Sequence, residues 1–277
     1  MTTTTTPFPT PHIHPPLPQS THTHTAILLH GRGSTGPEFA SELFSSCTSH
    51  GKPLPSHLPT FRWIFPTSKN RWNSRFEETI PAWFDAYSLT DITEHQELQG
   101  PGLRESVAYI LRILEEEITR LDGKPGNVFL GGISQGMAIA LWSWVCAGRK
   151  GLGRLGGVVG FCGWMPFAER FVDGDGGLDG GRRRLVEFCS GVMEGDLDLD
   201  MRVLDTPVLV GHGVDDPVVS VELGRQAVGI MKREGIQVEW MEYVGAEGDG
   251  HWIKEPEGFD AVLRFLQLGS GMGWSIS

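Results

Sequence analysis

The sequence predicts an α/β fold in which a mostly parallel central sheet carries helices on both faces. Short apolar runs alternate with segments of helical periodicity through most of the chain, the pattern of strand–helix–strand units. With 277 residues, the chain is long enough to bury a sizeable core as one domain. In such sheets, ligands bind beyond the carboxyl ends of the strands, so we expect function to lie in the loops that follow strands.

Strands are predicted where short apolar runs are bounded by turn residues. These runs are 25–29, 62–65, 128–130, 155–162, 206–210 and 237–244. Helices are predicted from segment length and from apolar residues that recur at helical spacing. These segments are 38–49, 103–121, 137–145, 218–233 and 255–268. We expect 67–89 to be mostly loop.

Residues 1–24 are rich in Thr, Pro and His and poor in apolar residues. We expect them to form a disordered tail, because such a run buries too little surface to offset chain entropy. The run lacks the basic and apolar segments of a secretory signal. Residues 25–269 are predicted to form a single domain with a Gly-, Asp- and Arg-rich excursion at 167–204, and 270–277 a flexible C-terminus.

Charge and cysteine usage restrict the classes of partner. The net charge of −11 argues against nucleic acid or an anionic membrane surface as the main partner. No stretch is long and apolar enough to predict a membrane span, so no stable membrane insertion is expected. The cysteines are widely spaced and show no zinc or redox spacing, so no metal is expected; they are Cys47, Cys146, Cys162 and Cys189. Free thiols are typical of a cytoplasmic protein.

The central motif is Gly132-Ile133-Ser134-Gln135-Gly136, a G-x-S-x-G sequence that follows the strand run 128–130 and opens a helical run. A serine on a sharp strand-to-helix turn has its hydroxyl lifted out of the sheet, in front of a helix N-terminus that favours negative charge. The alternative is a glycine-rich turn with a capping serine, in a chain that contains 37 glycines. The strand before the motif and the helix after it favour a nucleophile.

A serine nucleophile needs a base to take its proton and an acid to hold the tautomer of the base. In one class of α/β enzymes these follow in the order serine, acid, histidine. Asp216 is the preferred acid because Pro217 stiffens its turn; Asp215 is the nearest rival, and Asp249 is a weaker candidate. His251, between the last predicted strand and the last predicted helix, is the expected base.

Two further histidines, His30 and His212, each end a strand and precede a glycine. We expect their rings to bond loop backbone. The same chemistry requires two N–H donors for the oxyanion. One is the backbone N–H of Gln135, and the other comes from an earlier strand-end loop, for which the backbone N–H of Arg32 is chosen.

Four segments occur together in one order: Leu29-His30-Gly31-Arg32-Gly33-Ser34-Thr35-Gly36, Trp83-Phe84-Asp85, Gly131-Gly132-Ile133-Ser134-Gln135-Gly136 and His212-Gly213-Val214-Asp215-Asp216-Pro217. In this order they resemble the phospholipase/carboxylesterase family, which includes the acyl-protein thioesterases, and the similarity runs from about residue 26 to 268. The resemblance implies an α/β-hydrolase fold and hydrolysis of carboxylic esters or thioesters without a cofactor. It also supports Asp216 as the acid and Arg32 as an oxyanion donor.

The resemblance further implies that the loop at 67–86 helps to line an acyl channel, so Trp72, Phe76 and Trp83 are candidate substrate-binding residues. Here that loop carries charged residues where the family is largely apolar, and Arg32 stands where an apolar residue is usual. A shorter or more polar acyl group is therefore expected than a long chain.

The expected substrate is a small-molecule ester or an acylated protein, and the expected state is a monomer or homodimer. Two alternatives stay open. One is a lysophospholipase or a specialised-pathway esterase. The other is a binding protein that uses a hydrolase fold without catalysis.

Overall fold

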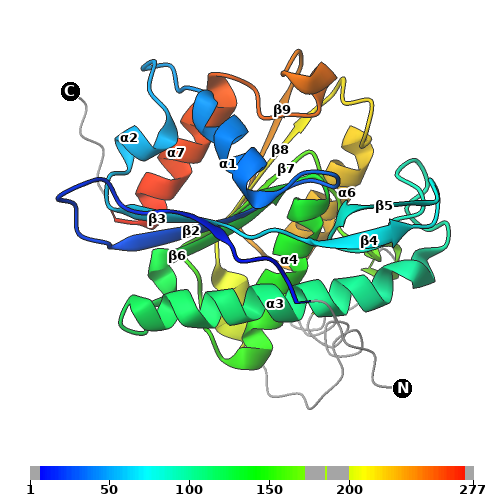
Figure 1. The fold of residues 1–277 in the computed structure, drawn as a ribbon, viewed down its shortest axis with the longest axis horizontal. Helices are drawn as coiled ribbons and strands as arrows, with labels where there is room; N and C mark the ends of the chain where they lie inside the picture. Colours follow the sequence, from blue (N-terminus) through cyan, green and yellow to red (C-terminus); the bar gives the residue numbers. More distant parts are fainter. Residues whose placement is uncertain (1–6, 172–184, 186–199, 272–277) are drawn as a thin grey trace.

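The computed structural model describes residues 7–171, 185 and 200–271. Its centre is a twisted seven-stranded sheet with the strand order β1-β3-β2-β6-β7-β8-β9 (Figure 1). The strands are β1 (His12–His14), β2 (His24–Leu29), β3 (Phe61–Phe65), β6 (Val128–Ile133), β7 (Gly157–Phe161), β8 (Val208–Gly213) and β9 (Val238–Tyr243). Only β1 runs antiparallel to its neighbour; every other adjacent pair is parallel. The predicted α/β class is confirmed.

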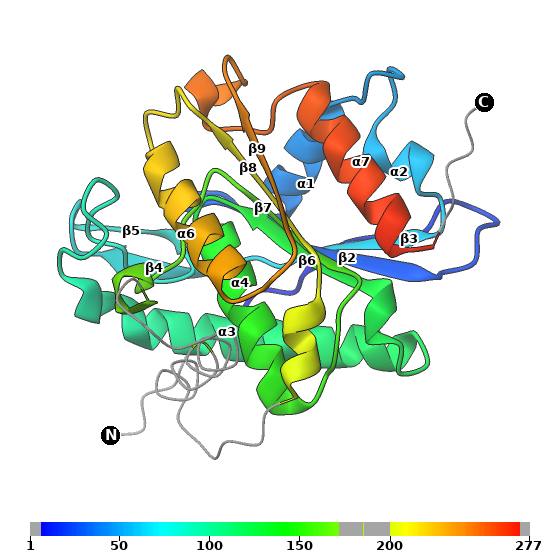
Figure 2. The ribbon, with the colours of Figure 1, turned by 180° about the vertical axis from the view of Figure 1, so that it is seen from behind.

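Helices cover both faces of this sheet (Figure 1 and Figure 2). One face carries α1 (Gly36–Ser45), α2 (Leu54–His57) and α7 (Glu257–Gly269), and the other carries α3 (Gln99–Arg120), α4 (Gln135–Ala147) and α6 (Val221–Arg233). Alternation along the strands divides the core in two. On β6, Phe129 packs in the layer of α1 and α7, whereas Leu130 packs in the layer of α3, α4 and α6.

The N-terminal segment corrects the expectation of a disordered tail at residues 7–24. Within it, β1 pairs antiparallel with the edge strand β3. The ring of Phe8 stacks on that of Tyr109 in α3 with centroids 4.0 Å apart, and the Tyr109 hydroxyl donates to the Pro9 carbonyl at 3.1 Å. Tertiary partners for the backbone and for Phe8 order a segment whose composition alone suggests disorder. Residues 1–6 lie outside the described chain.

The segment 67–89, expected to be mostly loop, contains a hairpin made of β4 (Lys69–Asn73) and β5 (Glu78–Ala82). The Asn73 side chain accepts the backbone N–H groups of Arg75 at 3.1 Å and Phe76 at 2.9 Å, which closes the turn. Charged residues and a proline in these strands hide the alternation that marks a half-buried strand.

The predicted excursion at 167–204 lies largely outside the described residues, as do its Gly/Asp run 173–181 and arginines 182–184. Its described parts include the short 3₁₀ helices η4 (Ala168–Phe171) and η5 (Met201–Asp205). At the C-terminus, α7 ends at Gly269, and 272–277 are not described. None of the helices within the described ranges has the length and hydropathy needed to span a bilayer.

Candidate active site

Ser134 stands alone between β6, which ends at Ile133, and α4, which begins at Gln135. Its φ of 55° and ψ of −124° place a non-glycine residue in a strained region. The turn is tight because its glycines lie against backbone: a Cβ added at Gly132 would lie 2.6 Å from the Gly136 carbonyl carbon, and one at Gly136 would lie 2.2 Å from the Leu29 oxygen. The sequence predicted this elbow, and larger residues at either glycine would disrupt it.

His251 follows the short 3₁₀ helix η6 (Gly248–Gly250) in the loop between β9 and α7. Its Nδ1 lies 2.7 Å from Oδ2 of Asp216, whose side chain is fully buried, whereas 18% of the His251 side chain is exposed. Because an ionised carboxylate only accepts hydrogen bonds, Nδ1 carries the proton, and Nε2 of the neutral ring is left as an acceptor. That is the tautomer a general base requires.

Asp216 is held as a carboxylate by donors on both oxygens. Its Oδ1 accepts the backbone N–H groups of Val218 at 2.8 Å and Val219 at 3.0 Å. Burial by itself raises the pKa of Asp216, but hydrogen bonds from the histidines at 212 and 251 and from the Val219 N–H outweigh it and lower the pKa well below its usual range. Asp215, the rival acid, instead accepts the Gly245 N–H at 2.7 Å.

A cleft of about 240 Å³ brings four of the predicted residues together: Arg32, Ser134, Gln135 and His251. The loop after β2 passes beside the serine, since a Cβ added at Gly31 would lie 3.4 Å from the Ser134 Cβ and 3.9 Å from its Oγ. Gln135 is the first residue of α4, so its N–H has no acceptor one turn earlier in the helix. The sequence does not predict the other residues that line the cleft, which include Phe39, Glu42, Leu89, Trp164, Val218 and Trp252.

The predicted substrate-binding aromatic residues are placed differently from one another. Trp83 is fully buried and donates through Nε1 to the His30 carbonyl at 2.8 Å, so it supports the loop after β2 from behind rather than lining the cleft. Trp72 and Phe76 are 56% and 58% exposed on the hairpin. The Phe76 ring centroid lies 5.5 Å from the guanidinium carbon of Arg32, which does line the cleft.

The Gln135 side chain links the turn at Ser134 to the segment around Trp83. Its Oε1 accepts the Trp83 N–H at 2.8 Å, and its Nε2 donates to the Phe84 carbonyl at 2.8 Å. Both contacts are buried. They fix the segment after β5 relative to the start of α4, and this linkage explains why the Trp-Phe-Asp segment accompanies the serine motif in the sequence.

His30 and His212 bond loop backbone, as predicted. Nδ1 of His30 lies 2.6 Å from the Gly31 carbonyl, and its Nε2 accepts the Ser68 N–H at 3.0 Å. Burial lowers the pKa of His30 from 6.5 to about 4. Nε2 of His212 lies 2.9 Å from the Val219 carbonyl. The sequence did not reveal that the same nitrogen also lies 3.3 Å from Oδ2 of Asp216.

The neutral, buried state of His30 predicts a pH dependence of folding. Between pH 6.5 and pH 4 the unfolded chain binds a proton at this residue that the folded chain excludes, so stability is full above 6.5 and declines as the pH falls toward 4. From pH 7 to pH 5 this amounts to about 2 kcal/mol. Urea unfolding at the two pH values should show that wild type loses about this much more than His30→Gln; equal losses would contradict the assignment.

Cys162, Asp216 and His251 offer ligand-type atoms within 4.8 Å of one another, the one such group among the residues that the structure describes. Burial raises the pKa of the Cys162 thiol to about 12, which disfavours the thiolate that metals bind. The Asp216–His251 hydrogen bond occupies the remaining ligand atoms. This chemistry suits proton transfer better than metal binding.

Comparisons with known proteins found a matching family model, relatives and solved structures. A family model described as Phospholipase/Carboxylesterase matches residues 15–177. The chain is 28% identical to acyl-protein thioesterase 1 of Gibberella zeae, over 88% of this chain and 89% of that one, and 30% identical to a probable carboxylesterase of Oryza sativa, over 83% and 71%. The crystal structure of Zea mays acyl-protein thioesterase 2 superposes with a TM-score of 0.67 at 25% identity, covering 95% of this chain and 99% of that one.

Proposed function

Because the chain belongs to the phospholipase/carboxylesterase family of α/β-hydrolases, it is a serine hydrolase of carboxylic esters or thioesters, and we propose that Ser134, Asp216 and His251 are its catalytic triad. The observation that carries the proposal is the 2.7 Å contact between His251 Nδ1 and Asp216 Oδ2 beside a cleft that Ser134 also lines. Nucleophile, acid and base come from loops that follow three different strands, in the order this enzyme class uses.

In the acylation step, Nε2 of His251 takes the proton of the Ser134 hydroxyl while Oγ attacks the acyl carbon. The charge on the carbonyl oxygen is stabilised by the backbone N–H groups of Arg32 and Gln135. Asp216 stabilises the imidazolium that forms. When the tetrahedral intermediate collapses, the bond to the alcohol or thiol breaks, and His251 returns its proton to that leaving group.

Deacylation repeats this chemistry with water. His251 takes a proton from the water as its oxygen attacks the acyl carbon of the Ser134 ester, and the same two N–H groups hold the oxyanion. Collapse breaks the bond to Oγ, which recovers the proton from His251. The carboxylic acid leaves, and the enzyme is restored with no cofactor required by any step.

The size of the cleft favours a short or polar acyl group. At about 240 Å³, it is below the usual range of roughly 300–1,000 Å³ for pockets that enclose drug-sized ligands. Arg32 and Glu42 add charge to an otherwise largely apolar wall. Acyl-protein thioesterases are named for acylated proteins, so a protein carrying a short acyl thioester is one substrate to test, and a lysophospholipid, the alternative, is another.

The proposal is tested with purified enzyme on p-nitrophenyl esters of two to sixteen carbons, a matched series of acyl thioesters, and a lysophospholipid. We expect hydrolysis of both esters and thioesters, with kcat/KM highest for the short chains because long chains exceed the cleft. A maximum at long chains would contradict the size argument. Absence of hydrolysis throughout would favour the non-catalytic alternative.

We infer a cytoplasmic location from the thiols. Cys47, Cys146 and Cys162 are all free in the described part of the chain, as is usual in a reducing compartment. The expectation of a monomer or homodimer stays a prediction.

A further inference from the structure

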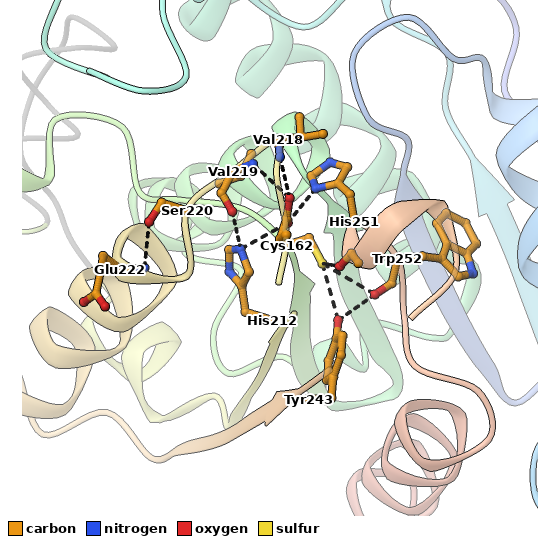
Figure 3. A network of polar contacts seen from close by, with 11 residues as sticks. Cys162, His212, Val218, Val219, Ser220, Glu222, Tyr243, His251 and Trp252 are labelled. Atoms are coloured by element: carbon orange, nitrogen blue, oxygen red, sulfur yellow. Dashed lines mark hydrogen bonds and ion pairs between the residues drawn. The ribbon is translucent and has the colours of Figure 1, made fainter. Parts of the chain in front are cut away.

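We propose that His212 is a positioning residue for the catalytic acid, holding the Asp216 carboxylate from the side opposite His251. This inference rests on the proposed triad. The His212 ring is fully buried at the end of β8, and its Nε2 lies 3.3 Å from the same Oδ2 that receives His251 Nδ1 at 2.7 Å. In Figure 3 the contacts of both rings are drawn converging between them.

The proton on His212 is placed by its backbone partner. The Val219 carbonyl, 2.9 Å from Nε2, only accepts hydrogen bonds. Nε2 therefore carries a proton, which it shares between that carbonyl and the Asp216 carboxylate. If the proton were on Nδ1 instead, the bare Nε2 would face the Val219 carbonyl and the Asp216 carboxylate, both acceptors. The free-energy cost of three acceptors in contact is larger in a buried site.

The far side of the ring is closed against a second proton. Nδ1 of His212 is buried and has no hydrogen-bond partner among the described residues. Helix α6 packs directly on it, since a Cβ added at Gly224 would lie 2.5 Å from Nδ1. A proton there would be an unsatisfied buried donor. The ring is thus held in place with Nε2 directed at Asp216.

With His212 included, Asp216 receives four donors: the two imidazoles on Oδ2 and the N–H groups of Val218 and Val219 on Oδ1. Besides the bond to His251, two backbone hydrogen bonds and the 3.3 Å contact with His212 Nε2 hold the carboxylate, so the acid that orients the base is itself fixed. A second donor on Oδ2 also disperses its charge. That weakens the hold of the carboxylate on a protonated His251 and favours the neutral base.

The neighbouring ionisable groups leave this donor role to His212. Burial raises the pKa of the Cys162 thiol and of the Tyr243 phenol, so both are uncharged beside Asp216. The Tyr243 hydroxyl donates instead to the Trp252 carbonyl at 2.7 Å, next to His251. Asp215, the adjacent acid, accepts the Gly245 N–H at 2.7 Å.

The remaining charges near His212 are paired with each other. Glu242 on β9 is bound by Arg225 of α6 at 2.7 Å. The Arg225 hydrogen bond is the main reason that the pKa of Glu242 falls to about 2. Glu242 therefore stays ionised and paired across the working range, and it introduces no titration of its own near neutrality.

The test measures kcat/KM against pH for a short p-nitrophenyl ester. His212→Phe keeps a ring but removes the donor. We expect its kcat/KM on the pH-independent plateau to fall roughly tenfold. The acidic limb, the part of the profile where kcat/KM falls as the pH is lowered, should move up by about half a pH unit. Both are the effect of losing one long hydrogen bond to a charged group. In His212→Gln, the side-chain amide reaches the position of Nε2, and we expect the limb to return to the wild-type position.

Two further variants separate positioning from folding. In His212→Asn the amide stops near the position of Nδ1, so its limb should shift as in His212→Phe; if the Phe variant does not fold, the Gln and Asn pair decides. The control is His24→Phe, which changes a buried histidine at the start of β2 that stacks on Phe61. It should lose stability on thermal unfolding without any shift of the limb.

The results that would overturn the role of His212 differ from those that would overturn the proposed triad. If wild type hydrolyses the ester but the donor-lacking variants keep its acidic limb, or shift it downward, the His212 inference is overturned and the triad stands. If wild type shows no hydrolysis, the proposed function fails first. An upward shift in Phe or Asn that Gln reverses supports the inference, because a merely structural histidine would alter stability without moving the pH profile.

Discussion

Replacing Ser134 with alanine is expected to lower kcat for a short p-nitrophenyl ester by roughly four to six orders of magnitude. The variant lacks the oxygen that forms the acyl-enzyme, so only binding and the oxyanion donors remain to assist attack by water. The elbow itself should survive, because alanine is smaller than serine at a site whose strain is held by the packing of Gly132 and Gly136. Hydrolysis is followed spectroscopically with the uncatalysed rate subtracted.

A second serine provides the matched control. Ser143 lies on α4, two turns beyond the elbow, and its hydroxyl is buried with no hydrogen-bond partner among the described residues. Ser143→Ala should keep wild-type kcat. A fluorophosphonate probe should label wild type and Ser143→Ala but not Ser134→Ala, with the modified peptide containing residue 134. Wild-type activity in Ser134→Ala would remove Ser134 from the mechanism.

The elements predicted correctly from sequence are those whose residues carry their own signal. β6 is buried throughout, so its apolar run is unbroken, and α3 repeats apolar residues at helical spacing. β1 was missed because its order comes from a partner elsewhere in the chain, and the β4–β5 hairpin was missed because charged residues and a proline hide its alternation. β1 is a three-residue edge strand, His12–His14, defined by its pairing with β3, and composition does not report such a partner.

The residues of the site also differ in whether the sequence around them gives a signal. Ser134, Asp216 and His251 could be chosen because each lies in a loop that follows a strand and the three occur in one order. The sequence does not give the distances between loops. Nothing in the local sequence distinguishes His212, which contacts Asp216, from His30, which contacts the Ser68 N–H. Trp83 was a substrate-binding candidate because the family resemblance implies that the loop at 67–86 lines an acyl channel. Its Nε1 in fact donates to the His30 carbonyl, a contact set by tertiary packing.

The choice of Asp216 over Asp215 is tested by replacing each with asparagine. Asp216→Asn should lower kcat by about 10⁴-fold. The amide keeps an oxygen to accept the N–H groups of Val218 and Val219, but its NH₂ group then faces His251. Nδ1 of His251 must accept from that group, the proton moves to Nε2, and the base is blocked on the side that faces Ser134.

Asp215→Asn is the matched control, because the rival acid bonds the Gly245 N–H through a carboxylate oxygen, and an amide oxygen can take over that bond. We expect its kcat to stay within about tenfold of wild type, the cost of weakening one hydrogen bond. A large loss in this variant with near-normal activity in Asp216→Asn would exchange the two assignments.

The stability of Asp216→Asn gives an independent check on the charge of the acid. Because the folded state lowers the pKa of Asp216 from 3.8, its ionised form stabilises the fold above that pH, and this contribution is lost as the pH falls further. Urea unfolding should therefore show a deficit in Asp216→Asn at pH 7 that shrinks below about pH 4. A deficit independent of pH would mean that the carboxylate is not held as an anion, and the orienting role proposed for it toward His251 would lose its electrostatic basis.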